Sequence, residues 1–286
     1  MATLKAIRRR ISSVKSTQQT TRAMKLVSAA RLRRAQQALL NARPYHENLS
    51  VIAASVLHAD PSALAPPADA QAAALLMVVG SDRGFCGGYN VNLIRKAEEE
   101  AQRLRGEGLA LRLFAIGRKP ADYFRRTRQA VAGQKTDNKP RLATVALARE
   151  LAARMLAEYQ SGQVRQAGIA YTTFRSAISM RPVFERLLPV EPPKDEATAG
   201  VDYLMEPSRA ELIPVVLRSY LESSVYHALL EAEASEEGAR MTAMDSATNN
   251  AAEMIQQLTL DMNRARQAAI TRELMEIVAG AEALRG

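Results

Sequence analysis

The stretch MTAMDSATNNAAEMIQQLTLDMNRARQAAI (241–270) decides the fold of this chain. Its apolar and small residues recur at alternating steps of three and four, the spacing of a coiled-coil seam. The seam consists of Met241, Met244, Thr248, Ala251, Ile255, Leu258, Met262, Ala265 and Ala269. No proline follows Pro214, so we predict one helix over residues 208–286. A helix of roughly 75 residues would be about 110 Å long, which predicts that it projects beyond its own domain.

A second helix with the same period is predicted over residues 1–57, which contain no glycine. Its seam follows Leu4, Ile7, Ile11, Val14, Gln18, Thr21, Lys25, Ser28, Leu32, Ala35 and Leu39. The middle of this seam is polar, although a self-sufficient two-stranded coil would favour leucine there. The polar positions therefore predict contacts with something else at that height.

The two predicted helices carry charge of opposite sign. Residues 1–43 hold eleven Lys and Arg and no Asp or Glu, whereas residues 208–286 hold seven Arg, no Lys and twelve acidic residues. This difference favours pairing of the two helices and leaves a basic face for an acidic partner. We predict an antiparallel coiled coil.

Between the helices the hydrophobic period changes to that of a mixed α/β domain. The proline-rich stretch 58–73 predicts a linker, and 191–207 predicts a loop. Strands are predicted at 73–80, 109–117, 166–174 and 181–190, and helices at 90–105, 119–127 and 142–160. The pattern predicts a Rossmann-like domain over 74–190 with a largely parallel sheet, inserted between the terminal helices. The fourth strand is expected beside the third.

Few residues of the chain suit catalysis. The loop GSDRGFCGGYN (80–90) lies where α/β folds bind phosphate, but it matches neither GxxxxGK[ST] nor GxGxxG, which favours a structural turn. Cys86 in this loop has no histidine near it in the sequence. The pair Glu236 and Glu237 is interpreted as a solvated face. Three scattered histidines and one cysteine predict no metal site, and we expect no cofactor.

The basic N-terminal helix allows several interpretations. An acid-free, Arg-rich N-terminus is typical of a mitochondrial transit peptide, but the unbroken seam favours a permanent helix. A nucleic-acid-binding basic helix would normally continue into its own zipper. A shaft seated in a protein cavity also fits, as does an α/β enzyme with a helical oligomerisation stalk. No run of some 18 apolar residues predicts a membrane span.

The two ends of the chain resemble one family. ITRELMEIVAGAEAL (270–284) is similar to the C-terminal signature of the gamma subunit of F-type ATP synthases. The first shaft helix of that family resembles IRRRISSVKSTQQTTRAMKLVSAARLRRAQ (7–36). Further similarity lies in RMTAMDSATNNA (240–251), ARQAAIT (265–271) and the loop 80–90. The resemblance thus covers nearly the whole chain.

This resemblance implies a non-catalytic rotor shaft, with catalysis on the beta subunits. The implied partners are three alpha and three beta subunits around the shaft, the epsilon subunit and the c-ring, with a delta subunit in the same complex. Rotation of the c-ring would turn the shaft and couple proton flow to ATP synthesis or hydrolysis. No nucleic acid is expected. A start without a presequence favours the cytoplasmic face of a bacterial inner membrane, where the chain would be peripheral through the c-ring.

The resemblance also implies roles for particular residues. Six are expected to contact the beta subunits and couple rotation to catalysis, namely Met24, Lys25, Arg240, Arg266, Gln267 and Thr271. Three are expected at the tip of the shaft, in an apolar bearing, namely Gly280, Ala281 and Leu284. The alternative, a basic coiled-coil protein that binds nucleic acid, predicts strongly salt-dependent DNA binding by the chain.

Overall fold

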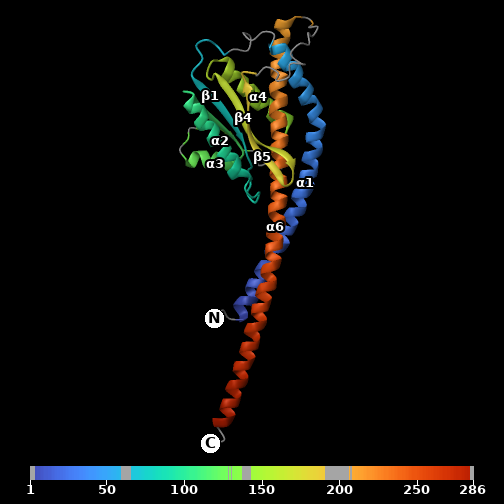
Figure 1. Ribbon diagram of the computed structural model, residues 1–286, viewed down its shortest axis with the longest axis vertical. Helices are drawn as coiled ribbons and strands as arrows, with labels where there is room; N and C mark the ends of the chain where they lie inside the picture. Colours follow the sequence, from blue (N-terminus) through green and yellow to red (C-terminus); the bar gives the residue numbers. More distant parts are fainter. Residues whose placement is uncertain are drawn as a thin grey trace. The chain divides into compact units, whose positions relative to one another are not determined.

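Two long helices, one from each end of the chain, are present in the computed structural model (Figure 1). Helix α1 is Leu4–His58 and helix α6 is Arg209–Ala283, in agreement with the helices predicted over 1–57 and 208–286. The structure describes residues 4–58, 66–127, 129, 131–136, 143–190, 206 and 208–283. Much of the predicted linker 58–73 and nearly all of the predicted loop 191–207 lie outside these residues, so those boundaries stay predictions.

The predicted seams are confirmed in both helices. Every seam position of α1 from Leu4 to Leu39 is buried or half-buried. The same holds for every seam position of α6 from Met241 to Ala269. The buried faces therefore follow the alternating steps of three and four that the sequence shows.

The chain divides into two compact units. The first consists of residues 1–27 and 241–286, and the second of residues 28–240. Each long helix therefore contributes one segment to each unit. The predicted α/β domain and the adjoining parts of both helices belong to the second unit.

A five-stranded sheet in the order β3-β2-β1-β4-β5 forms the centre of the second unit. Its strands are β1 (Ala73–Val79), β2 (Ala110–Ile116), β3 (Val131–Lys135), β4 (Gln166–Ser176) and β5 (Ser179–Leu188). The first four pair in parallel, and β5 runs antiparallel to β4. This confirms the largely parallel sheet and the pairing of the last two strands. The remaining helices are α2 (Tyr89–Gly106), α3 (Arg118–Arg126) and α4 (Val145–Gln160).

Strand β3 was not expected from the sequence. Its five residues, VAGQK, contain no apolar run, and none of them is fully buried. The strand lies at the edge of the sheet, and among the described residues its one strand partner is β2. An edge strand with little buried surface needs no hydrophobic alternation, so the usual signal is missing.

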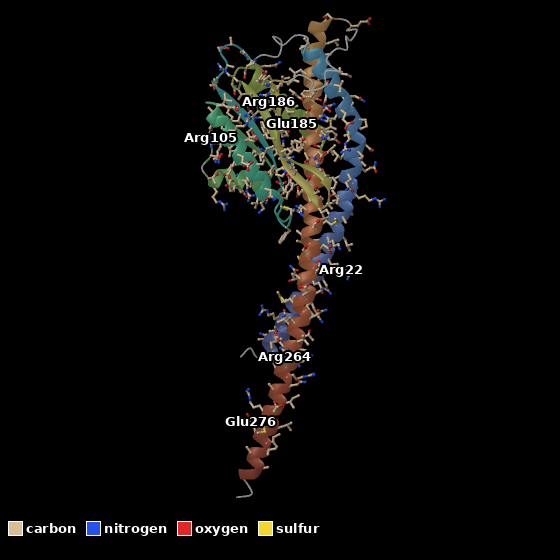
Figure 2. All side chains as sticks on the ribbon, in the orientation of Figure 1. Arg22, Arg105, Glu185, Arg186, Arg264 and Glu276 are labelled. Carbon is tan, nitrogen blue, oxygen red and sulfur yellow. The ribbon has the colours of Figure 1, made fainter. Side chains whose placement is uncertain are left out.

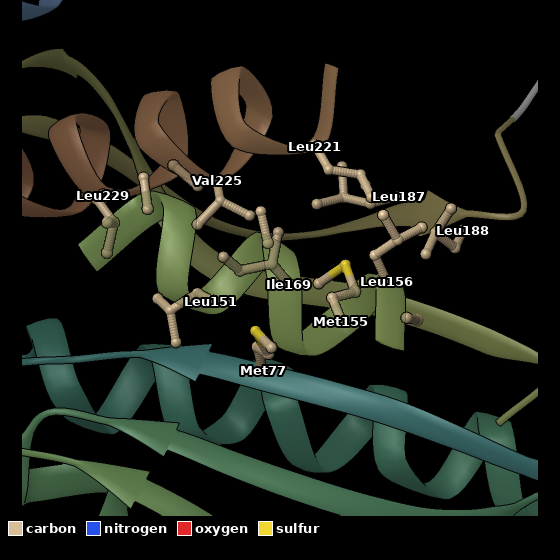
Figure 3. Close-up of a cluster of buried hydrophobic side chains, with 14 of the residues drawn as sticks. Met77, Leu151, Met155, Leu156, Ile169, Leu187, Leu188, Leu221, Val225 and Leu229 are labelled. Carbon is tan, nitrogen blue, oxygen red and sulfur yellow. The ribbon is translucent and has the colours of Figure 1, made fainter. Parts of the chain in front are cut away.

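Helix α6 packs on one face of the sheet as part of the larger core. Side chains alternate along β1, so that Leu75 and Met77 face this core while Leu76 faces α2 and α3 on the opposite side. In Figure 3, Val225 of α6 lies over side chains from α4 and β4, with Met77 of β1 beneath them. Apolar burial thus fixes the N-terminal part of α6 against the α/β domain.

A stacked pair of histidines joins α1 to α6 in the second unit. The ring centroids of His46 and His227 are 4.4 Å apart and the rings are inclined by 9°. Burial lowers the pKa of His227 to about 4, and His46 and Arg43 act in the same direction. Burial also lowers the pKa of His46, against the opposing effect of Glu47. Both rings are neutral at pH 7, and each has a polar neighbour on α6: His227 Nε2 lies 3.5 Å from Glu231 Oε1, and His46 Nδ1 lies 3.4 Å from Ser223 Oγ.

We expect this histidine pair to make the protein less stable in mild acid. The unfolded chain binds a proton at His227 with the ordinary pKa of 6.5, whereas the folded chain binds it only near pH 4. The contribution of His227 to stability is therefore fully present above about pH 6.5 and is lost as the pH falls toward 4. Allowing for solvent screening of the partly exposed ring, the loss should be about 1–2 kcal/mol. Urea unfolding at pH 7.5 and pH 5 measures it. The variant His46→Gln/His227→Gln should lose less stability over that interval, and an unchanged slope would contradict the assignment.

Candidate functional site

The first unit is an antiparallel pair of helical segments. Lys25 Nζ lies 2.5 Å from Asp245 Oδ1, and Thr248 Oγ1 donates a hydrogen bond of 2.8 Å to Thr21 Oγ1. Partner numbers in α6 rise as those in α1 fall, which confirms the antiparallel direction. Three of these side chains, Thr21, Lys25 and Thr248, occupy polar positions of the predicted seams, whereas Asp245 is the residue after the seam position Met244. The polar positions are therefore satisfied partly within the pair.

A polar groove opens at the same height. Its cavity volume is about 320 Å³. The lining residues are Gln18, Gln19, Arg22, Lys25, Asp245, Thr248 and Asn249. Two of them, Arg22 and Lys25, are cationic, and Figure 2 shows Arg22 on the surface of α1. Met24, the other residue expected here to contact a beta subunit, is half-buried.

Beyond this pair, α6 continues without α1 beside it. The antiparallel register places Leu4, the first described residue of α1, opposite about residue 265 of α6. The predicted contact residues Arg266, Gln267 and Thr271 lie at and beyond this point and are exposed. The neighbouring side chains of Arg264 and Glu276 are labelled in Figure 2.

The end of α6 exposes apolar side chains as well as polar ones. Five large apolar residues are 49–67% exposed, namely Ile270, Leu274, Met275, Ile277 and Val278. Gly280 has no heavy atom within 4 Å of an added Cβ, and Ala281 is exposed. Leu284, the third expected tip residue, lies outside the described residues. An exposed apolar surface on this scale indicates a protein partner.

Arg240 has a different environment from the other predicted contact residues. It belongs to the second unit and is 6% exposed. Its Nη1 donates to Glu237 Oε1 over 2.8 Å, its Nη2 donates to Glu236, and its Nε donates to the carbonyl of Gly84 over 3.4 Å. Arg240 therefore binds α6 to the 80–90 loop of its own chain.

The interpretation of Glu236 and Glu237 as a solvated face was wrong. Their side chains are 15% and 7% exposed and both pair with Arg240. Burial raises the pKa of Glu236, although Arg240 opposes the shift. Two adjacent acidic residues, taken alone, do not reveal whether they are buried. The signal that was available is Arg240, which follows them at the three- and four-residue spacing of helical ion pairs.

The 80–90 loop is built as a structural turn. Asn90 Oδ1 accepts hydrogen bonds from the backbone N–H of Ser81 and from Ser81 Oγ, over 3.2 and 3.0 Å. Cys86 is 2% exposed, and burial raises its pKa, so that the reactive thiolate is disfavoured. Its sulfur contacts the side chains of Ser81 and Asn90. None of the hydrogen-bond partners that the structure describes for it is a histidine. This geometry favours packing over nucleophilic chemistry.

Two further features bear on the site. Among the described residues, no group of three or more His, Cys, Asp or Glu side chains is arranged to bind a metal ion. Within the same parts of the chain, each helix is too polar or too short to cross a membrane.

Comparison with known proteins agrees with this architecture. Residues 3–284 match a family described as ATP synthase. A chain in the central stalk and c-ring structure of the Tetrahymena thermophila mitochondrial ATP synthase is 25% identical, with a TM-score of 0.60, and the match covers 80% of this chain and 99% of that one. A chain of the Euglena gracilis mitochondrial ATP synthase, in a structure of OSCP, F1 and c-ring in rotational state 3, shares the fold at 19% identity. Its TM-score is 0.69, with coverage of 98% and 94%.

Sequence similarity is higher among bacterial proteins. The ATP synthase gamma chain of Moorella thermoacetica is 48% identical over 290 residues, which cover 100% of this chain and 100% of that protein. Such identity extends through both long helices and the α/β domain. Together with the family match over residues 3–284, it shows that the chain belongs to the family of ATP synthase gamma chains.

Proposed function

We propose that this chain is the central-stalk rotor subunit of a proton-translocating F-type ATP synthase. It transmits rotation of the c-ring to a ring of three alpha and three beta subunits, and so couples proton flow to ATP synthesis or hydrolysis. The observation that supports this most directly is the stretch of α6 from residue 266 to 281, which lacks α1 beside it and exposes both polar and apolar side chains. A lone helix with that surface needs a surrounding protein.

The two helices can act as an axle because their pairing leaves distinct surfaces at successive heights. The polar groove with Arg22 and Lys25 would meet an acidic segment of a beta subunit, with Met24 beside it. Closer to the C-terminus of α6, three polar residues would hydrogen-bond a loop of beta, namely Arg266, Gln267 and Thr271. Because the helix pair is not three-fold symmetric, each beta subunit would face a different side of it. Rotation would then change the three beta sites in turn.

At its end, α6 would turn inside an apolar collar formed by the ring. Gly280 and Ala281 have small side chains or none, so they offer few groups that would have to break contacts during rotation. Leu284 would extend this surface. The exposed Ile277 and Val278 supply apolar contact area without directional bonds.

The chemistry of ATP would lie in the beta subunits, and this chain would bind no cofactor. Its α/β domain would contact the epsilon subunit and the c-ring, with the delta subunit elsewhere in the complex. We place the chain at the cytoplasmic face of a bacterial inner membrane, held there through the c-ring. The nucleic-acid-binding alternative is not supported, because the family matched along the chain is that of ATP synthase.

Co-purification tests this function. The chain, tagged at its N-terminus and expressed in its own cells, should bring down alpha, beta and epsilon subunits in one large ATPase. Recovery of the tagged chain alone, or with nucleic acid that high salt removes, would contradict the rotor function.

The polar residues near the C-terminal end of α6 should affect torque. We expect Arg266→Ala/Gln267→Ala to reduce ATP-driven torque by about half, because it removes donors whose bonds contribute about 1.5–3 kcal/mol each when charge-assisted. The measurement is the rotation rate of a loaded bead on the assembled complex. The matched variant Gln257→Ala/Arg264→Ala makes the same two changes at exposed positions of α6 and should lose less torque. Equal torque in both variants would remove this role.

A further inference from the structure

Strand β4 continues beyond the strand that pairs with it. Its parallel pairing with β1 ends at Val78 and Ala170, while β4 itself continues to Ser176. Its antiparallel partner β5 accompanies it on the other edge. The peptide groups that face one edge of a strand recur at every second residue. Those of Thr172 and Phe174 on the β1 edge therefore lack a strand partner and need another one.

Helix α6 supplies those partners from its side chains. The backbone N–H of Phe174 donates a hydrogen bond to Glu231 Oε2. The hydroxyl of Ser235 donates to the carbonyl of Thr172 over 2.9 Å. Glu231 and Ser235 are four residues apart, so they lie on one face of the helix, and they are 5% and 0% exposed. Two side chains of α6 thus replace a missing strand.

Other bonds hold the same turn of α6 from different directions. Tyr89 Oη donates to the carbonyl of Ala232 over 3.3 Å, and the backbone N–H of Ala143 donates to Glu233 Oε2 over 3.0 Å. At 3.6 residues per turn, Glu233 projects about 200° away from Glu231 around the helix axis. Rolling of α6 in either direction would therefore lengthen a bond on one of its sides.

Apolar packing alone would not give this resistance. Hydrophobic burial is non-directional, so a helix can roll or slide on an apolar face while much of the area stays buried. Hydrogen bonds weaken steeply as their angles depart from linearity. The segment that carries these bonds, 231–235, lies within the part of α6 that packs on the sheet. It is the place where a turning force on the α/β domain would enter the helix.

We propose that Glu231 and Ser235, through their hydrogen bonds to Phe174 and Thr172, are positioning residues that prevent α6 from rolling on the α/β domain under torque. We name these two bonds the torque latch. The proposal rests on the proposed function as a rotor and adds to it the place where rotation passes from the α/β domain to the shaft. The latch touches no reacting group and acts only through the orientation of α6.

The test compares torsional stiffness in the assembled ATPase complex. A magnetic bead on the α/β domain reports angular fluctuations while the end of α6 is cross-linked to the surrounding ring. Glu231→Met/Ser235→Ala removes both latch bonds and should increase the angular variance about twofold or more. Glu231→Gln keeps a carbonyl that accepts from Phe174, so it should retain most of the stiffness. ATP hydrolysis by the unloaded, uncross-linked complex should stay close to the unchanged protein in all variants.

A control of the same chemistry separates the latch from general damage to the domain. Glu98→Met/Ser161→Ala removes an acceptor for Tyr123 Oη and a hydroxyl that donates to the carbonyl of Glu158, both away from α6. It should leave the angular variance unchanged. Equal variance in the control and the latch variant would overturn the proposal, as would a latch variant as stiff as the unchanged protein.

Hydrogen exchange keeps the proposal testable if the latch variant fails to assemble. Tyr89→Phe/Ser235→Ala removes two hydroxyls with almost no change of shape, and its assembled complex should also show increased variance. In the full chain alone, Glu231→Met should raise the exchange rate of the Phe174 amide about tenfold or more, and Glu231→Gln much less. An unchanged rate in Glu231→Met would overturn the latch even if the chain proved to be no rotor. A chain that assembles into no ATPase would contradict the proposed function and leave this exchange result to decide the bonds.

Discussion

Replacing Arg240 by alanine is expected to lower the free energy of unfolding by about 3–5 kcal/mol, because the change leaves buried carboxylates without their cation. The side chains of Arg240 and Glu237 are both 7% exposed, and that of Glu236 is 15% exposed. Arg31 would be the remaining cation near Glu237, with its Nη1 3.4 Å from Oε1, and it is 35% exposed. No other ion pair of Glu236 is present among the described residues. Chemical unfolding of the purified chain at pH 7.5 measures the loss.

The loss should shrink in acid, and this dependence identifies its cause. Burial already raises the pKa of Glu236 with Arg240 present, and removal of the cation that opposes this shift raises it further. A carboxyl whose folded pKa exceeds its unfolded pKa stabilises the fold below the unfolded pKa, and that contribution is lost as the pH rises through the folded pKa. Arg240→Ala should therefore be closest to the unchanged protein near pH 5 and furthest from it above pH 7.

The neighbouring arginine provides the control. Arg31→Ala removes a longer and more exposed contact with the same Glu237 and should cost about 0–1 kcal/mol. The triple variant Arg240→Met/Glu236→Gln/Glu237→Gln removes the charges together and should recover much of the loss, since paired removal of buried charges is often nearly neutral. Equal losses for Arg31→Ala and Arg240→Ala would contradict the buried-network explanation.

This result matters for the role that the family resemblance implies for Arg240. A contact with a beta subunit remains a prediction. A coupling defect in Arg240→Ala could instead arise because α6 is held less firmly against the 80–90 loop. Lys25→Ala separates the two explanations. The Lys25–Asp245 pair is 38% and 45% exposed, so its loss should cost only about 0–1 kcal/mol of stability. Coupling loss in a stable Lys25→Ala complex would point to contact with beta.

The long helices and most of the sheet could be predicted from the sequence because their signals are local. A seam of alternating steps determines which face of a helix is buried, and both seams are confirmed from Leu4 to Leu39 and from Met241 to Ala269. Three strands, β1, β2 and β4, are rich in apolar residues, and β5 shows alternation, so the sequence indicates all four directly. The exposure of Arg266, Gln267 and Thr271 also follows from the seam, since none of them occupies it.

The features that could not be predicted depend on segments far apart in the sequence. Thr172 and Phe174 need α6 only because β1 ends before β4, and nothing within β4 states where β1 ends. Asp245 was missed as the partner of Lys25 because the register of the helix pair requires both seams to be aligned. Strand β3 gains its place from the open edge of β2.

Replacing Gly117 by alanine is expected to cost at least about 3 kcal/mol, because backbone strain and a backbone clash add together. Gly117 follows β2 directly and has φ 96° and ψ 149°, a region that residues with a Cβ rarely occupy. A Cβ built there would lie 2.3 Å from the carbonyl oxygen of Gly80, which follows β1. The obstacle is backbone at the carboxyl end of a central strand, so no side chain can move aside to relieve it.

The sequence offers a matched control for this change at Gly106, the last residue of α2. A Cβ there would meet no heavy atom within 4 Å, and the helical backbone favours alanine by about 0.5–1 kcal/mol. Thermal unfolding should show a large drop for Gly117→Ala and little change or a small gain for Gly106→Ala. The size of the drop also tests whether the sheet can shift. If the free energy of unfolding of Gly117→Ala is within about 1 kcal/mol of that of the unchanged protein, then β1 and β2 can separate at their carboxyl ends. The nearby 80–90 loop would then be a less rigid support for Arg240 than its hydrogen bonds indicate.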